Sequence, residues 1–123
     1  MGCSRDFESF LTAVIDRTSF DRIKTYLDSA KASSDCEILT GGNCDDSKGY
    51  FIEPTIIVTK DPHYETMCNE LFGPVLTVHV YDEKNYEDTL KMCSETSDYA
   101  LTGSIFARDR AAIRTADHHL STA

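Results

Sequence analysis

The sequence predicts an α/β fold with a mostly parallel sheet and crossover helices. From Thr18 onward, segments of strand-like composition alternate with segments whose apolar residues recur at helical spacings of three and four. Strands that are separated by helices in this way usually form βαβ units. The length of 123 residues, of which 41% are hydrophobic and 27% charged, is compatible with one domain that buries a core.

The first helix is predicted to begin at Thr18, whose hydroxyl suits an N-cap. Its apolar stripe should face the sheet and consists of Phe20, Ile23, Leu27 and Ala30. A short strand is predicted at residues 36–40. The pair Gly41-Gly42 ends this strand, and residues 43–48 are expected to form a polar loop.

The next strand region, residues 50–58, is rich in β-branched and aromatic residues but contains Pro54. Because proline cannot donate to a strand ladder, we expect either two short strands or one broken edge strand here. Residues 63–69 indicate a helical turn or two. Residues 75–81 alternate their apolar side chains between two faces and form the clearest strand of the chain.

The last third of the chain is predicted to contain a helix, a strand and a second helix. The helix over residues 83–97 has one apolar stripe, formed by Tyr86, Leu90 and Cys93. The strand is expected at residues 101–106. Asp109 should cap the final helix. The apolar face of this helix consists of Ile113, Ala116 and Leu120.

Composition limits the classes of partner. The chain has 21 acidic and 12 basic residues and a formal charge of -9. Nucleic acids and anionic membranes need clustered basic residues, so we expect neither as a partner. No apolar run approaches the ~20 residues that span a bilayer. Five cysteines without a Cys-x-x-Cys pair favour a reducing, intracellular compartment.

A phosphoacceptor receiver domain is one alternative for an acidic α/β chain of this length. Asp45-Asp46 would be its acidic pair and Asp82 its acceptor. Such a site also needs a lysine near the end of the final strand, and no lysine follows Lys91. The helix that precedes every strand is wrong for this class as well, so the alternative is rejected.

The loop at residues 69–75 is the strongest candidate site. It places Glu70 and Phe72 on a segment punctuated by Gly73 and Pro74, directly before the clearest strand. In that setting a carboxylate can accept hydrogen bonds from a sugar diol, and an aromatic ring can lie against a flat heterocycle. The simpler interpretation is a surface glutamate and a core phenylalanine in a tight turn.

The other sulfur and imidazole groups are expected to be structural, and no metal site is predicted. Cys68 has no basic neighbour in sequence to stabilise a thiolate, and Cys93 should be a small core residue. His118 and His119 point about 100° apart on a helix, which is the wrong spacing for joint metal binding. His79 should be a hydrogen-bonded structural histidine.

Three blocks, in one order, resemble the aldehyde dehydrogenase superfamily. They are Gly41-Gly42 followed by Gly-Tyr-Phe-Ile-Glu-Pro-Thr-Ile at 49–56, Glu-Leu-Phe-Gly-Pro at 70–74, and Tyr-Ala-Leu-Thr-Gly-Ser-Ile-Phe at 99–106 with Asp109. Finer similarities point to one branch and lie at residues 13–16, 19–20, 22–24, 42–47 and 60–62 and in Leu-Thr-Gly at 101–103. That branch comprises the mitochondrial Δ1-pyrroline-5-carboxylate (glutamate γ-semialdehyde) dehydrogenases.

The resemblance implies an enzyme that oxidises the aldehyde glutamate γ-semialdehyde to glutamate with NAD in proline breakdown. It also implies a mitochondrial matrix location and a homo-oligomer at full length. Matched residue by residue, Glu70 corresponds to the carboxylate that holds the nicotinamide-side ribose, and Phe72 to the ring beside the nicotinamide. These two are the predicted cofactor-binding residues. Ala100 replaces a glycine of the family pattern and is expected to strain its loop if that position has a positive φ.

No catalytic residue is assigned in this chain. None of its five cysteines has the Gly-Gln-Lys/Arg-Cys context of the family's nucleophile, and the base glutamate and the dinucleotide-binding domain also find no match. Residues 1–123 are therefore interpreted as the C-terminal half of a catalytic domain, inactive in isolation. Two alternatives remain open: a non-catalytic interaction module derived from this fold, and an aldehyde dehydrogenase of another substrate branch.

Overall fold

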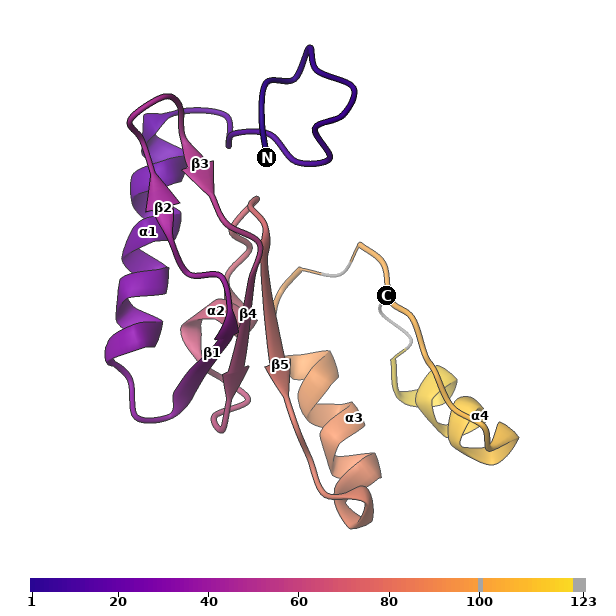
Figure 1. Ribbon diagram of the computed structural model, residues 1–123. Helices are drawn as coiled ribbons and strands as arrows, with labels where there is room; N and C mark the ends of the chain where they lie inside the picture. Colours follow the sequence, from indigo (N-terminus) through magenta and orange to yellow (C-terminus); the bar gives the residue numbers. More distant parts are fainter. Residues whose placement is uncertain (100, 121–123) are drawn as a thin grey trace.

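The core of the chain is a three-stranded sheet with one helix along its face (Figure 1). The computed structural model describes residues 1–99 and 101–120. The strand order is β1-β4-β5. The three strands are β1 (Cys36–Thr40), β4 (Thr55–Thr59) and β5 (Val75–His79). These elements confirm the α/β class.

Helix α1 (Arg17–Ala32) covers one face of the sheet. The predicted stripe is confirmed, because all four of its residues are buried: Phe20, Ile23, Leu27 and Ala30. The predicted N-cap is wrong by two positions. Asp16 is the cap, and its carboxylate accepts a hydrogen bond of 2.7 Å from the Ser19 amide. A carboxylate in this place also interacts favourably with the helix dipole, which a threonine hydroxyl does not.

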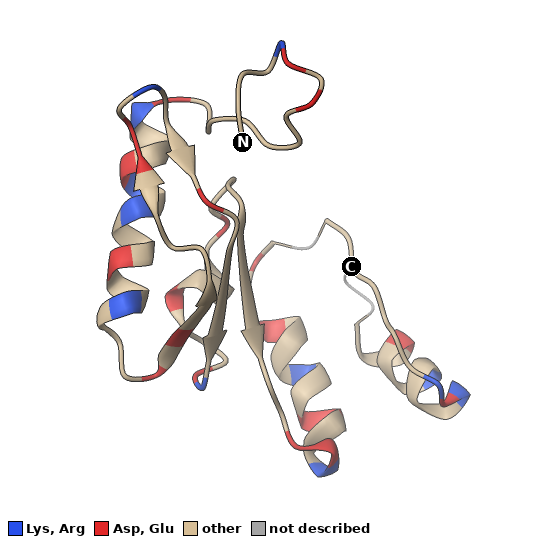
Figure 2. Ribbon diagram, in the orientation of Figure 1, with Lys and Arg blue, Asp and Glu red and all other residues tan. Residues whose placement is uncertain are grey.

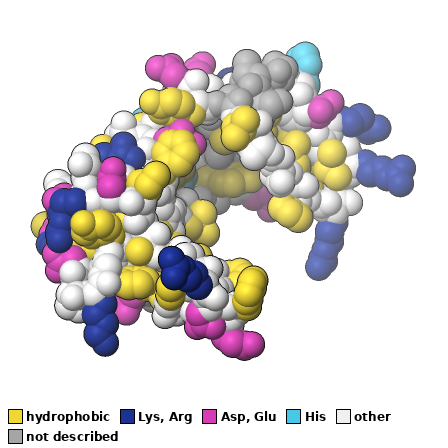
Figure 3. All heavy atoms as spheres, turned by 90° about the horizontal axis from the view of Figure 1, so that it is seen from above, with side chains coloured by type: hydrophobic (Ala, Val, Ile, Leu, Met, Phe, Trp, Pro, Cys, Tyr) yellow, Lys and Arg dark blue, Asp and Glu magenta, His cyan; other side chains and the backbone are white. Residues whose placement is uncertain are grey.

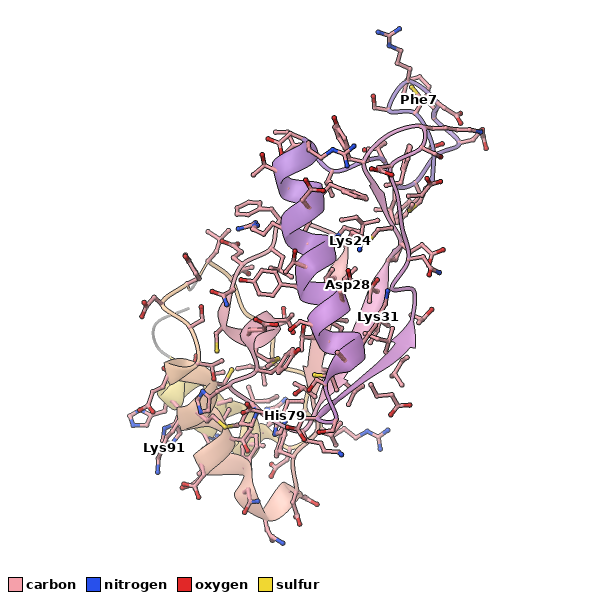
Figure 4. The ribbon with its side chains drawn as sticks, turned by 90° about the vertical axis from the view of Figure 1, so that its left-hand side faces the viewer. Phe7, Lys24, Asp28, Lys31, His79 and Lys91 are labelled. Atoms are coloured by element: carbon pink, nitrogen blue, oxygen red, sulfur yellow. The ribbon has the colours of Figure 1, made fainter. Side chains whose placement is uncertain are left out.

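The outward side of α1 carries charges of both signs (Figure 2). Lys24, Asp28 and Lys31 lie in a row along this helix (Figure 4), and Asp28 forms ion pairs with both lysines. Lys31 also donates a hydrogen bond from Nζ to the carbonyl of Gly42. This row therefore joins the outer face of α1 to the turn after β1.

The sheet is mixed, which corrects the prediction of a mostly parallel one. β4 and β5 are parallel, with Thr55 opposite Val75, whereas β1 and β4 are antiparallel, with Cys36 opposite Thr59. Parallel neighbours need a crossover connection, and the chain between β1 and β4 contains no helix. It forms instead a small hairpin of β2 (Cys44–Asp45) and β3 (Phe51–Ile52), and the direction of the chain reverses.

Pro54 separates β3 from β4 and confirms two short strands at residues 50–58. The edge-strand alternative is wrong, because β4 is the central strand and is paired on both sides. The polar loop predicted at 43–48 contains β2. Gly41 lies at a φ of 75°, and a β-carbon there would stand 2.2 Å from the Pro54 carbonyl oxygen, so this close crossing of two chain segments requires glycine.

A short helix, α2 (Glu65–Cys68), connects β4 to β5. The Thr77 hydroxyl on β5 donates a 2.9 Å hydrogen bond to the Thr66 hydroxyl on α2. β5 ends at His79, two residues earlier than predicted. Nδ1 of His79 lies 3.0 Å from the Thr59 carbonyl, which confirms the structural role expected of this histidine.

Two further helices, α3 (Tyr86–Glu95) and α4 (Arg110–His119), pack against each other beyond β5 (Figure 1). A short 3₁₀ turn at Glu83–Asn85 precedes α3. Asp109 caps α4 as predicted, and its carboxylate accepts a 2.8 Å hydrogen bond from the Ala111 amide. The Tyr86 hydroxyl donates to the carbonyl of Ala112 at 2.9 Å. This contact joins the two helices.

Two predictions for the last third are corrected. Cys93 is exposed, although Leu90 of the same α3 stripe is buried. On the apolar face of α4, Ala116 is buried and Ile113 is 36% exposed. Residues 101–106 form no strand, and no described strand pairs with them. Ala100 lies outside the described residues.

The second face of the sheet is uncovered in the described part of the chain. Leu39 of β1 is 57% exposed and Leu76 of β5 is 58% exposed. Seen from above, the surface is hollowed, and hydrophobic side chains are visible around the hollow (Figure 3). In residues 1–99 and 101–120, no helix is long and apolar enough to cross a membrane.

Candidate functional site

The candidate loop lies between α2 and β5, and its side chains alternate between core and surface. Leu71 is only 7% exposed and belongs to the core under α1. Its neighbours Glu70 and Phe72 are both exposed. Burial of Leu71 in the core leaves the side chains of Glu70 and Phe72 on the surface of the loop.

Three contacts fix this loop to the rest of the fold. Arg22 of α1 donates from Nη2 to the carbonyl of Leu71 at 2.8 Å. The amide of Thr55 donates to the Pro74 carbonyl, also at 2.8 Å. Gly73 lies against α1, where a β-carbon would stand 2.5 Å from Cδ1 of Ile23. The loop is therefore held between α1 and the central strand.

Phe72 combines a left-handed backbone with an unburied ring. Its φ is 53°, and it is the single non-glycine residue with a positive φ in the described chain. Such a conformation costs a residue with a side chain about 1–2 kcal/mol. A hydrogen bond from a charged donor, such as that of Arg22 to the preceding carbonyl, contributes about 1.5–3 kcal/mol, which is enough to offset this cost.

The Phe72 ring is 79% exposed, so the interpretation of Phe72 as a core residue is wrong. Apolar contacts in the core therefore do not explain the left-handed backbone. Strain of this kind at an exposed aromatic residue is typical of a residue whose position serves a ligand.

The loop lines an open groove with a second segment from the third sequence block. The groove has a volume of about 740 Å³. One wall is formed by residues of the 67–72 segment, including Glu70 and Phe72, and the other by residues of the 97–102 segment, including Tyr99 and Thr102. Two blocks that are separated by β5 and α3 in sequence thus meet at one site.

Two carboxylates line the described part of this groove, those of Glu70 and Asp98, and Glu70 is the one on the loop with Phe72. Within residues 1–99 and 101–120, no hydrogen bond or ion pair involves its side chain. Its neighbours are already engaged: Asn69 donates from Nδ2 to the Glu65 carbonyl at 2.9 Å, and Cys68 donates from Sγ to the His63 carbonyl at 3.3 Å. Glu70 can therefore accept hydrogen bonds from two hydroxyls of one ligand.

The Cys44 thiol and the Asp46 carboxylate are not among the groups that line the groove. Burial raises the pKa of the Cys44 thiol, which favours the unreactive protonated form. Asp46 accepts a hydrogen bond of 2.6 Å from Arg17, which lowers the pKa of this carboxyl. The Arg17 guanidinium also lies 5.0 Å from the centre of the Tyr50 ring. These groups join α1 to the β2–β3 hairpin and have a structural role.

Among the described residues, no group of three or more histidine, cysteine, aspartate or glutamate side chains is arranged to hold a metal ion.

Sequence reasoning found Glu70 and Phe72 but missed the contact that holds them. Arg22 is 49 positions from Leu71, and no local pattern relates the two. The second wall of the groove could be recognised from the sequence, since residues 99–102 belong to the third block. That sequence signal was obscured because residues 101–106, which overlap this segment, were interpreted as a strand.

Comparison with known proteins gives one consistent match. Residues 1–123 match the aldehyde dehydrogenase family. The mitochondrial delta-1-pyrroline-5-carboxylate dehydrogenase of Dictyostelium discoideum is 58% identical over 123 residues, which are 100% of this chain and 22% of that protein. The Homo sapiens enzyme of the same name is 46% identical over 120 residues, 98% of this chain and 21% of that protein.

A solved structure agrees with these relatives. The delta-pyrroline-5-carboxylate dehydrogenase from Mycobacterium tuberculosis, bound with NAD, superposes with a TM-score of 0.77 at 39% identity. The match covers 89% of this chain and 19% of that one. The chain thus spans about a fifth of the length of the proteins that it matches.

Proposed function

The chain belongs to the aldehyde dehydrogenase family, and we propose that it is part of an NAD-dependent enzyme that oxidises glutamate γ-semialdehyde to glutamate in proline breakdown. The observation that carries this proposal is the groove in which an unpartnered Glu70 and an exposed, left-handed Phe72 lie together. The identity with relatives of that name favours this substrate over other aldehydes.

NAD fits the chemistry of this groove. The Glu70 carboxylate is an acceptor for the two hydroxyls of the nicotinamide-side ribose. The Phe72 ring offers an apolar surface for the flat nicotinamide, and its fixed backbone reduces the ordering cost of that contact. When bound, NAD accepts the hydride that the aldehyde loses.

In this proposal the residues of this chain bind NAD and orient its ribose and nicotinamide. Glu70 restricts rotation of the ribose, and Phe72 limits the positions that the nicotinamide ring can occupy. Orientation of this kind raises the rate of a transfer that depends on the distance and angle between two reacting groups. No described side chain in the groove is placed as nucleophile, since Cys68 is engaged with the His63 carbonyl and lies on a helical turn without a basic partner.

We propose that further parts of a longer polypeptide supply the nucleophilic cysteine, the base glutamate and the dinucleotide-binding domain. In this view residues 1–123 are the C-terminal half of the catalytic domain and are inactive alone. We also propose a mitochondrial matrix location; the names of the curated relatives support the mitochondrion as the compartment. A homo-oligomer is proposed at full length, with the uncovered sheet face as one surface that other segments have to cover.

The proposal is tested with the full-length protein that contains this chain. Purified enzyme should reduce NAD with glutamate γ-semialdehyde and much more slowly with acetaldehyde or propionaldehyde. The isolated 123-residue chain, assayed in parallel, should show no reduction of NAD. Absence of activity in the full-length protein with every aldehyde would support the non-catalytic module, and a preference for another aldehyde would support another substrate branch.

A further inference from the structure

Arg22 differs from its neighbours Arg17 and Lys24 on α1 in what it binds. Arg17 and Lys24 form ion pairs with nearby carboxylates. Among the described residues Arg22 forms no ion pair, and its guanidinium donates from Nη2 to the backbone carbonyl of Leu71 at 2.8 Å. This bond is partly buried and connects two residues that are 49 positions apart. The guanidinium of Arg22 thus holds the groove loop through this hydrogen bond.

The Leu71 carbonyl, which accepts the hydrogen bond from Arg22, belongs to the peptide unit whose orientation sets φ of Phe72. The Leu71 carbonyl and the Phe72 amide lie in one rigid plane. Rotation of this plane changes ψ of Leu71 and φ of Phe72 together, and a relaxed φ for Phe72 would be negative. A hydrogen bond that fixes the carbonyl therefore opposes the rotation by which Phe72 would leave its φ of 53°.

The residues on either side of Phe72 are held by packing, whereas Phe72 itself is not. On one side Leu71 is buried, and on the other Gly73 lies against Ile23. Phe72 itself has an exposed side chain, so its own packing contributes little to keeping the strained conformation. The bond from Arg22 is the polar contact that acts on this unit directly.

We propose that Arg22 is a positioning residue for NAD binding: it holds the Leu71–Phe72 peptide so that the Phe72 ring keeps its place in the groove. The inference rests on the proposed function of the groove. Without the bond, Phe72 relaxes to a negative φ, and the binding-competent conformation becomes a minor population. The apparent dissociation constant for NAD then rises as the inverse of the fraction of protein that keeps this conformation.

The experiment compares NAD binding by calorimetry in the full-length protein and two variants. Arg22→Met removes the donor but keeps most of the side chain's apolar length, and Lys24→Met removes a cation two residues away that does not contact the loop. Arg22→Met should raise the dissociation constant for NAD about 5- to 30-fold. It should leave the KM for the aldehyde unchanged. Lys24→Met should bind NAD like the wild type.

A double-mutant cycle separates positioning from a general loss of stability. Phe72→Gly removes the ring and adopts a positive φ without strain. In the Phe72→Gly background, Arg22→Met should have no further effect on NAD affinity, whereas a purely structural role would give the same loss in both backgrounds. Equal losses, or an unchanged dissociation constant in Arg22→Met, would overturn the inference.

A milder variant covers the case in which Arg22→Met does not fold. Arg22→Lys keeps a cationic donor group but loses the planar fork of the guanidinium, and it should give an affinity between those of the wild type and Arg22→Met. Wild-type affinity in Arg22→Lys alongside an unfolded Arg22→Met would indicate a structural role and overturn the inference. Failure of the proposed function gives a different result from failure of this inference. If it fails, the wild-type protein itself binds no NAD, whereas failure of this inference shows only in the comparison with Arg22 variants.

Discussion

Gly73 and Ile23 are in such close contact that a β-carbon on Gly73 would stand 2.5 Å from Cδ1 of Ile23. Ile23 is fully buried in the stripe of α1, and Gly73 follows the two exposed residues of the groove loop. This contact determines how closely the groove loop approaches α1. The glycine of the Glu-Leu-Phe-Gly-Pro block is therefore needed for close approach rather than for a positive φ.

Replacing Gly73 with alanine should destabilise the chain by overpacking, by about 1–3 kcal/mol in the free energy of unfolding. Urea denaturation followed by circular dichroism measures this value. The matched variant is Ile23→Val, which removes the Cδ1 methyl group. In the Ile23→Val background, Gly73→Ala should cost less than in the wild type, and equal costs in both backgrounds would contradict the contact.

Truncation of the α1 stripe should cost more than truncation of the open sheet face. Leu27 is fully buried, so Leu27→Ala should lower the free energy of unfolding by about 2–5 kcal/mol. Leu39 is 57% exposed, so in the isolated 123-residue chain Leu39→Ala should change it by less than about 0.5 kcal/mol. Equal losses in the two variants would show that the open face of the sheet is covered in solution.

The ion pair between Arg17 and Asp46 predicts a loss of stability in acid. The hydrogen bond from Arg17 lowers the folded-state pKa of Asp46 below its ordinary value of 3.8. The contribution of this pair is therefore present above pH 3.8 and is lost as the pH falls through the folded-state value. The urea midpoint of Asp46→Asn should be lower than that of the wild type at neutral pH. The two midpoints should converge in acid, and a constant difference would contradict the assignment.

Cys44 should react slowly with alkylating reagents. Burial raises its pKa above the ordinary 9.0, and the thiolate is the reactive form. Iodoacetamide at neutral pH, followed by mass spectrometry of the peptides, should modify the exposed Cys93 well before Cys44. Comparable rates at the two cysteines would show that the β2–β3 hairpin opens readily.

Local patterns were sufficient where an element depends on its own residues. The stripe of α1 was predicted residue by residue, because a helix that packs on a sheet must bury positions spaced by three and four. Pro54 likewise predicted a break within residues 50–58, although the choice between two short strands and one broken edge strand came only from the sheet order. The antiparallel direction of β1 was not predictable in this way, since it depends on how the β2–β3 hairpin returns the chain to the sheet.

Long-range contacts account for what the sequence did not reveal. Residues 101–106 have strand-like composition, but a strand also requires a neighbour to pair with, and no described strand provides one. Glu70 and Phe72 were found from their residue types and from a family motif. The exposed, left-handed state of Phe72 and its control by Arg22 depend on the packing of α1 against the loop, which no local pattern encodes.

The most direct measurement is the dissociation constant for NAD of the full-length protein and its Glu70→Gln variant, determined by calorimetry. Loss of a charged acceptor for the ribose hydroxyls should raise this constant about tenfold. Glu37→Gln, which neutralises an exposed carboxylate on β1 away from the groove, is the control and should bind NAD like the wild type. An unchanged constant in Glu70→Gln would contradict the placement of the nicotinamide-side ribose at Glu70.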